Sequence, residues 1–357
     1  MSTSAKASRN SAIELLRIFA MLAIVLSHIC YHSGFDYTYS PLSINRLFVR
    51  FGLLGDLGVV VFVLITGYFQ CTGTFRIRAF SRQLGQVWFY SITLFLLCRF
   101  GFGWEYSGNA LLAVFFPTIF NEYWFFTAYM ILYLLSPFLN RMLSALTRRQ
   151  LEAMLTIMLL CWVVIPTVTK QSMYGSEIPQ FLLFYLLGAY FRLYPDNLLK
   201  KPALRVGISL LGIGMLYGLT LLFAFLERYT PEAFGASAVL YDRNSLFILL
   251  WAVGFFAIAV YSKPFSNRFV NTVSGCTFGV YLIHENPPIR ELLWKNWLHW
   301  GNYFTSGSFI PRLILSVLLV YCVCTAIDWL RQKTVAKPIE NAIDTLLRRI
   351  LKRTMLV

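Results

Sequence analysis

Long apolar runs, separated by short polar and basic segments, fill most of this chain. Ten runs are long enough to cross a bilayer, for which a helix needs about 20 mostly apolar residues. A shorter run at residues 110–120, interrupted by Pro117, is expected to be a re-entrant or interfacial piece. The pattern predicts an all-α, polytopic membrane helix bundle. The ten expected spans are residues 12–33, 54–71, 84–103, 122–140, 151–168, 178–193, 205–226, 246–261, 272–287 and 309–330.

Basic residues recur in every second loop of this arrangement. Loops on the side of the N-terminus carry most of the Lys and Arg, and such loops face the cytoplasm in membrane proteins. Both termini are therefore expected to be cytoplasmic. We expect residues 1–335 to form the transmembrane domain and residues 336–357 a basic amphipathic tail. That tail either lies on the inner leaflet or forms a solvated helix on the cytoplasmic face.

The composition supports this class. The chain is 58% hydrophobic and only 13% charged, which is far more apolar than a soluble domain. Its net charge of +15 is accounted for by the basic loops, so nucleic acid is not an expected partner. The seven cysteines lie mostly in apolar segments and are expected to be free. The first apolar run is too long for a cleaved signal sequence and is expected to remain as the first span.

Two ionisable residues, Arg17 and His28, lie inside that first run. Eleven residues make three helical turns plus about 20°, so both side chains lie on one stripe, about 16 Å apart along the axis. Buried ionisable groups in a membrane segment point to a functional path. A neutral His can act as a general base near pH 7. Glu14, three residues before Arg17, offers a purely structural partner for that charge.

Several motifs together resemble acyltransferase family 3. The Arg17-x10-His28 pair resembles the family signature in the first span. The runs 58–69, 78–82, 123–137 and 278–284 resemble later elements in the expected order. The third-span element departs from the usual pattern, because Gln83 and Gln86 stand where further basic residues are expected and the following Pro is absent. Which of the basic residues near that span match the family is therefore open.

The resemblance implies an enzyme that moves an acyl group, most often acetyl, from acyl-coenzyme A to a hydroxyl of a cell-surface polysaccharide or its precursor. It implies a multi-pass protein of a bacterial cytoplasmic membrane, here a stand-alone form without an appended hydrolase-like domain. Acyl-coenzyme A would be a substrate, with no bound cofactor expected. Arg76, Arg78 and Arg82 could bind its phosphates, although the charge bias of an inside loop also explains them.

His28 is the expected general base, with Arg17 holding the donor or stabilising negative charge on the acyl oxygen. An acyl-histidine relay stays open. His284 is expected near the depth of His28, where it orients the acceptor or caps a helix. Glu122 and Trp124 are candidate acceptor contacts, and Trp124 could equally be an interfacial anchor. No metal site is expected from the four histidines.

Two other functions compete with the enzyme. A transporter or flippase for a polysaccharide precursor would use the same buried Arg and His as substrate or proton-relay groups. No internal repeat symmetry is visible, which weighs against a transporter. A structural partner of a biosynthetic complex would tolerate substitution of both residues.

Overall fold

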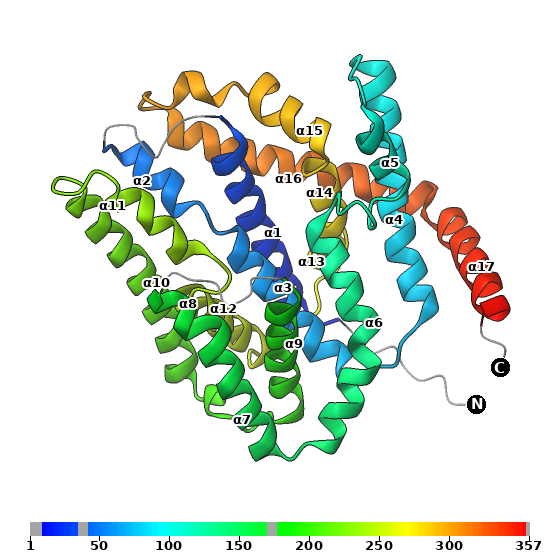
Figure 1. The fold of residues 1–357 in the computed structure, drawn as a ribbon, viewed down its shortest axis with the longest axis horizontal. Helices are drawn as coiled ribbons and strands as arrows, with labels where there is room; N and C mark the ends of the chain where they lie inside the picture. Colours follow the sequence, from blue (N-terminus) through cyan, green and yellow to red (C-terminus); the bar gives the residue numbers. More distant parts are fainter. Residues whose placement is uncertain (1–8, 35–41, 170–176, 355–357) are drawn as a thin grey trace.

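The computed structural model describes residues 9–34, 42–169 and 177–354, and within these ranges the chain is helical without strands (Figure 1). Three π-helical turns extend or interrupt helices at Leu97–Gly101, Leu160–Val164 and Leu292–Trp297. Short 3₁₀ turns lie at Leu198–Lys200, Ser237–Tyr241 and Trp300–Tyr303. The α-helices are α1 (Ser11–His32), α2 (Ile44–Phe51), α3 (Gly55–Gln70), α4 (Ile77–Leu96), α5 (Gly108–Phe115), α6 (Trp124–Ala145), α7 (Arg148–Leu159), α8 (Ile165–Thr169), α9 (Glu177–Leu193), α10 (Pro202–Leu226), α11 (Ala233–Ala236), α12 (Leu246–Val260), α13 (Arg268–Ser274), α14 (Thr277–His284), α15 (Pro287–Glu291), α16 (Phe309–Thr334) and α17 (Ala336–Thr354).

Seven helical segments in the described ranges are long and apolar enough to cross a membrane. The expected spans 122–140, 178–193 and 272–287 fall outside these seven. Helix α9 has 17 residues, and the last of the three is divided between α13 and α14. The count of ten and the cytoplasmic side of the termini stay predictions. The seven segments are Ser11–His32, Ile44–Gln70, Ile77–Gly101, Arg148–Thr169, Pro202–Leu226, Ala233–Val260 and Phe309–Thr334.

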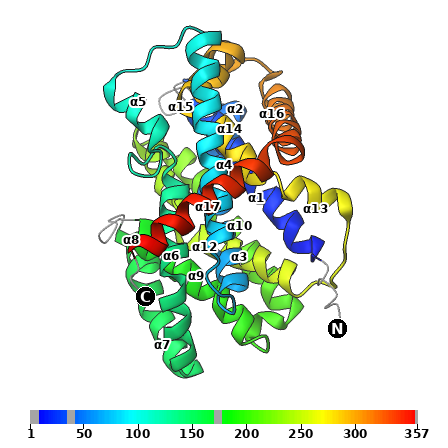
Figure 2. The same cartoon turned by 90° about the vertical axis from the view of Figure 1, so that its right-hand side faces the viewer.

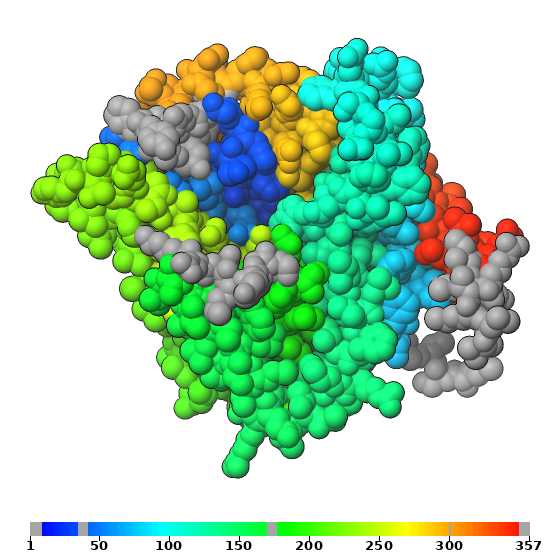
Figure 3. Space-filling view, in the orientation of Figure 1, coloured from blue at the N-terminus to red at the C-terminus, as the bar shows by residue number. Residues whose placement is uncertain are grey.

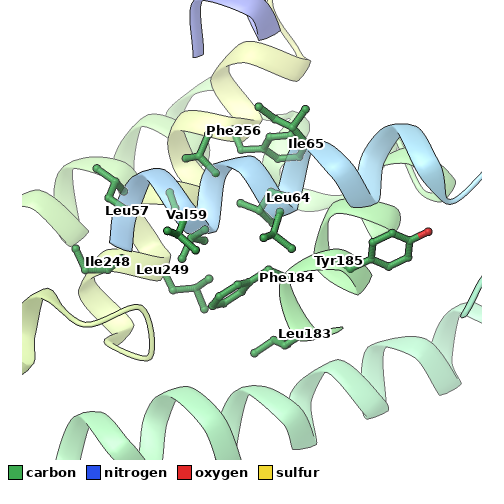
Figure 4. Packing of buried hydrophobic residues seen from close by; sticks show 14 of the residues in the cluster. Leu57, Val59, Leu64, Ile65, Leu183, Phe184, Tyr185, Ile248, Leu249 and Phe256 are labelled. Atoms are coloured by element: carbon green, nitrogen blue, oxygen red, sulfur yellow. The ribbon is translucent and has the colours of Figure 1, made fainter. Parts of the chain in front are cut away.

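Helix α3 is the central helix of the bundle and packs against α1, α9 and α12. Its closest crossing is with α9, where a side chain on Gly67 would meet the backbone of Tyr185 and one on Gly188 would meet the backbone of Leu64. Small residues allow such backbone contact between membrane helices. Buried side chains of α3, α9 and α12 fill the space around this crossing (Figure 4). The crossing fixes the helix that forms one wall of the cavity described below.

Polar contacts between helices gather at the two ends of the bundle. At one end, Asn140 of α6 donates to the carbonyl of Gln70 at 2.8 Å, which joins the ends of α3 and α6. At the other end, the backbone N–H of Arg243 donates to Asp56 Oδ2 at 2.9 Å, near the start of α3. We call these the Gln70 end and the Asp56 end.

A buried carboxylate of α16 is hydrogen-bonded to α4 and packs against α14. Asp328 is completely buried and its Oδ1 accepts from Tyr90 Oη and Arg331 Nε, each at 2.8 Å. Gly279 of α14 leaves room for this carboxylate, because a Cβ there would collide with it. The position of α14 matters because its last residue is His284.

Helix α17 covers most of the expected amphipathic tail and packs along α4, which it crosses in Figure 2. Ile339 and Ile343 lie against Gly85, and Ser81 Oγ donates to Asp344 Oδ1 at 3.3 Å. Whether the helix also contacts lipid stays a prediction. All seven cysteines are free, as expected.

Candidate active site

One large cavity of about 850 Å³ runs through the bundle between the Gln70 end and the Asp56 end. Its volume lies in the range of roughly 300–1,000 Å³ that is usual for ligand sites. Figure 3 shows residues of α1 (blue) in a recess, with residues of α14 and α15 (yellow to orange) along the right side and residues of α6 at the lower right. Five arginines and three carboxylates line the cavity: Arg17, Arg50, Arg76, Arg82, Arg243, Asp56, Asp242 and Glu285.

Helix α1 places two of the expected site residues in this cavity. Asn10 caps the helix by accepting from the N–H of Ala12 at 3.1 Å, and the helix continues unbroken from residue 11 to residue 32. Arg17 and His28 both line the cavity. An unbroken helix keeps them about 16 Å apart, as the spacing predicts.

The Gln70 end of the cavity is cationic. Arg17, Arg76 and Arg82 line it there without a lining carboxylate among the described residues. Glu14 accepts from Arg17 Nη1 at 3.3 Å, so the expected pair forms, yet the Arg17 side chain stays 30% exposed. This end can therefore hold an anionic ligand.

Arg78 lies one helical turn before Arg82 on α4, about 40° from it around the helix axis. It does not line the cavity. It belongs to the same helix face as Ser81 and Gly85, the face against which α17 packs, and its charge acts on Asp344. Of the three arginines, Arg76 and Arg82 therefore line the cavity, and Arg78 does not.

At the Asp56 end, two histidines from distant parts of the chain touch. Nδ1 of His28 lies 2.9 Å from Nε2 of His284, and Nδ1 of His284 lies 2.6 Å from the carbonyl of Val280. A carbonyl only accepts, so Nδ1 of His284 carries a proton and the neutral ring accepts at Nε2. His28 must then donate from Nδ1. Its own Nε2 is left with a lone pair, which is the form that a general base requires.

Glu285 is the carboxylate of this group. Its Oε2 lies 3.0 Å from His28 Nδ1 and 3.9 Å from His32 Nε2. Its Oε1 accepts from Arg290 Nη1 at 2.8 Å, which fixes the orientation of the carboxylate. Glu285 and His28 line the cavity, whereas His284 is completely buried behind them. Glu285 can stabilise positive charge on His28.

His28, His284 and Glu285 also offer three metal-ligand atoms within 4.8 Å of one another. Histidine nitrogens and a carboxylate are a donor set that Zn²⁺ accepts, and the bond from His284 to Val280 resembles a second-shell contact. His28 and His284 already contact each other at 2.9 Å. Oε2 of Glu285 lies 3.0 Å from His28 Nδ1 as an ion-pair contact and has no hydrogen-bond partner among the described residues. This arrangement suits both a proton-transfer group and a metal site.

Glu122 and Trp124 are not brought together. Trp124 begins α6 and lines the large cavity, with the Arg243 guanidinium 4.5 Å from its ring centroid. Glu122 lines a second cavity of about 310 Å³ at the same end. Burial raises the pKa of the Glu122 carboxyl, against the opposing effect of Arg290.

Sequence reasoning did not single out Glu285, Arg290 or the cavity residues Arg50 and Arg243 as site residues. Glu285 directly follows His284, and the proline pair after it marks the end of the helix. A Glu next to His284 at a helix end indicates that a carboxylate could lie beside the histidine. Arg50 and Arg243 carried no signal beyond their charge, since both lie in segments that read as outer loops.

A protein-family model described as an acyltransferase domain, the acyltransferase 3 type, matches residues 10–329. No curated protein and no solved structure matches the chain.

Proposed function

The chain belongs to acyltransferase family 3 and is therefore a membrane acyltransferase that acts on a hydroxyl, and on this premise we propose its donor, acceptor and chemistry. The donor is acyl-coenzyme A, and the acceptor is a hydroxyl of a cell-surface polysaccharide or its precursor. The observation that carries the proposal is a single cavity with a cationic end and a histidine–carboxylate end.

The cationic end suits the phosphates of coenzyme A. Guanidinium groups form strong, paired hydrogen bonds with phosphate oxygens, and Arg76 and Arg82 stand at the mouth where those phosphates would enter. Arg17 lies about 16 Å from His28, a distance that an extended pantetheine arm covers. The thioester then lies near His28 while the nucleotide stays at the mouth. Given the positive-inside bias, this mouth faces the cytoplasm, where acyl-coenzyme A is made.

The proposed reaction uses the neutral form of His28, which has its proton on Nδ1 and a free lone pair on Nε2. Its Nε2 takes the proton of the acceptor hydroxyl, and the oxygen attacks the thioester carbonyl carbon. The carbon–sulfur bond breaks, and the coenzyme A sulfur leaves with the proton that His28 returns. Glu285 stabilises the imidazolium during this exchange, as the carboxylate of a catalytic triad does. His284 acts as a positioning residue, because it holds Nδ1 of His28 as a donor and has no exposed atom for a substrate.

The acyl group is proposed to be acetyl, and the location a bacterial cytoplasmic membrane. Family membership supports the class of reaction, and the apolar spans support a multi-pass protein. The acetyl group and the polysaccharide acceptor rest on the resemblance described above.

The test is transfer from labelled acetyl-coenzyme A by the purified protein in detergent or lipid. His28→Ala should lower transfer about 10²- to 10⁴-fold, the usual contribution of a general base. Leu315→Ala, an exposed apolar position on α16, controls for expression and extraction. Full activity of His28→Ala would overturn the mechanism. Binding of acetyl-coenzyme A without thiol release, across a broad set of acceptors, would favour the transporter instead.

A further inference from the structure

The second cavity lies beside the first at the Asp56 end. It is formed by the segment before α5, by Glu122, and by the segment 287–295. Figure 1 shows α5 and α15 as neighbours at one edge of the bundle. Two side chains join the two cavities. His32 lines both of them, and Arg290 lines the second while its guanidinium binds Glu285 in the first.

The groups available in the second cavity are aromatic rings and carboxylates. Both cations are engaged, since Arg290 binds Glu285 at 2.8 Å and Lys295 lies 3.5 Å from Glu291. Glu105 and Glu122 have no ion-pair partner among the described residues. Trp104 and Tyr106 stand beside them. Carboxylate oxygens accept from hydroxyls, and aromatic rings pack on the C–H face of a sugar.

The backbone holds two of these side chains in place. Gly103, directly before Trp104, has a φ of 66°, and Asn121, directly before Glu122, has a φ of 53°. This left-handed region suits Gly, and Asn is among the few other residues that tolerate it. Each of these residues directly precedes a side chain that lines the cavity.

The cavity also lies within reach of the chemistry. His32 is one helical turn beyond His28, and their ring centroids are 5.6 Å apart. Because His32 lines both cavities, a sugar ring in the second cavity would lie beside the ring that neighbours His28. This is the approach that transfer to an acceptor needs.

We infer that the second cavity binds a sugar ring of the acceptor and favours neutral or amino sugars over anionic ones. The inference rests on the proposed function, because that function makes the bound sugar the acceptor of the acyl group. The selectivity for neutral or amino sugars follows from the carboxylates of Glu105 and Glu122. An anionic sugar would bring a third negative charge beside these two carboxylates, whereas hydroxyl and ammonium groups can donate to them.

The experiment compares methyl β-glucoside, glucosamine and glucuronate as acceptors of the acetyl group. Glu122→Gln should raise the KM for methyl β-glucoside about tenfold, as the loss of one hydrogen bond to a charged group would. Trp104→Ala should raise it by a similar factor, about tenfold, because the sugar loses its packing surface. Both variants should leave the KM for acetyl-coenzyme A unchanged. Glu105→Gln combined with Glu122→Gln should narrow the preference for methyl β-glucoside over glucuronate. Glu232→Gln, an exposed carboxylate elsewhere, is the matched control.

Ligand-observed NMR of the same sugars measures binding without turnover. Weaker binding of methyl β-glucoside by Glu122→Gln and Trp104→Ala supports the cavity as the sugar site, even if the protein releases no thiol and the proposed function fails. Unchanged KM values and unchanged NMR binding in all variants would overturn the inference while leaving acyl transfer intact. A preference for glucuronate in the unmodified protein would overturn the selectivity.

Discussion

The Nδ1 atom of His28 lies 2.9 Å from the Nε2 atom of His284, and the carbonyl of Val280 fixes the direction of that hydrogen bond. The two rings therefore form a chain in which His284 accepts and His28 donates. Glu285 lies 3.0 Å from the same Nδ1 atom, so the donor of His28 faces a ring nitrogen and a carboxylate together. The opposite edge of His28 is left as the basic edge.

Replacing Glu285 by Gln should lower kcat about 10²- to 10⁴-fold while both KM values change little. Glutamine keeps the shape of the side chain but cannot stabilise an imidazolium, and the matching change in a catalytic triad costs about 10⁴-fold. His284→Ala should cost less, about tenfold, because the Glu285 carboxylate 3.0 Å from Nδ1 can still stabilise the imidazolium. Steady-state kinetics with acetyl-coenzyme A measures both. Equal kcat values for Glu285→Gln and the unmodified protein would contradict the role of the carboxylate.

The three arginines at the start of α4 should separate in their effect on the donor. Arg76→Ala and Arg82→Ala should each raise the KM for acetyl-coenzyme A about threefold to tenfold, modest because these pairs are partly exposed to water. Arg78→Ala should leave it unchanged, because Arg78 faces α17. Added salt should weaken donor binding in the unmodified protein. If Arg78→Ala raised the KM for acetyl-coenzyme A as much as the other two substitutions, lining the cavity would not be what makes an arginine important for donor binding.

Metal removal should leave activity unchanged, because the proposed reaction uses the His28–His284 hydrogen bond and the negative charge of Glu285. Dialysis against EDTA followed by a transfer assay measures this. Added Zn²⁺ should inhibit, since the three donor atoms could bind it and His28 would no longer be correctly held. If EDTA abolished transfer and Zn²⁺ restored it, the group would be a metal site.

The crossing of α3 and α9 should tolerate no added atom. Gly188→Ala places a methyl group against the backbone of Leu64, which cannot move aside as a side chain can. We expect a loss of roughly 1–3 kcal/mol in stability or more, as in other overpacked sites. Gly207→Ala in α10 is the matched control, because nothing lies within 4 Å of the added atom and alanine favours helix. Thermal unfolding of the detergent-solubilised protein compares the two, and equal midpoints would refute the packing argument.

Local geometry made part of the site predictable. The stripe shared by Arg17 and His28 follows from helical repeat alone, and counting spans placed His284 near the depth of His28. The position of Glu285 was harder, because it depends on where α14 ends and how that helix is rotated about its axis. Arg78 and Arg82 are one helical turn apart, so the sequence does not show that only Arg82 lines the cavity. That difference depends on how α4 is rotated between the cavity and α17.

The span count shows the same limit. Helix α1 is one long apolar run and was predicted within a residue or two. The expected span at residues 272–287 is instead two short helices, α13 and α14, meeting at Gly275 and Cys276. The mean hydropathy of a long window stays high across such a break, so it does not reveal that the helix is interrupted. Glu122 and Trp124, both expected as acceptor contacts, line different cavities, because α6 begins at Trp124 and Glu122 lies on the preceding turn. Their roles stay predictions.

Because α1 is unbroken between Arg17 and His28, the number of residues between them fixes both their separation and their relative angle around the helix axis. Inserting one residue between them would rotate one side chain by 100° and take it out of the cavity, while changing the separation by only 1.5 Å. The distance between Arg17 and His28 can therefore change only by insertions or deletions that keep both side chains on one stripe, which means steps of about seven or eleven residues. A small change in the space available to a different acyl chain must therefore come from the side chains between Arg17 and His28.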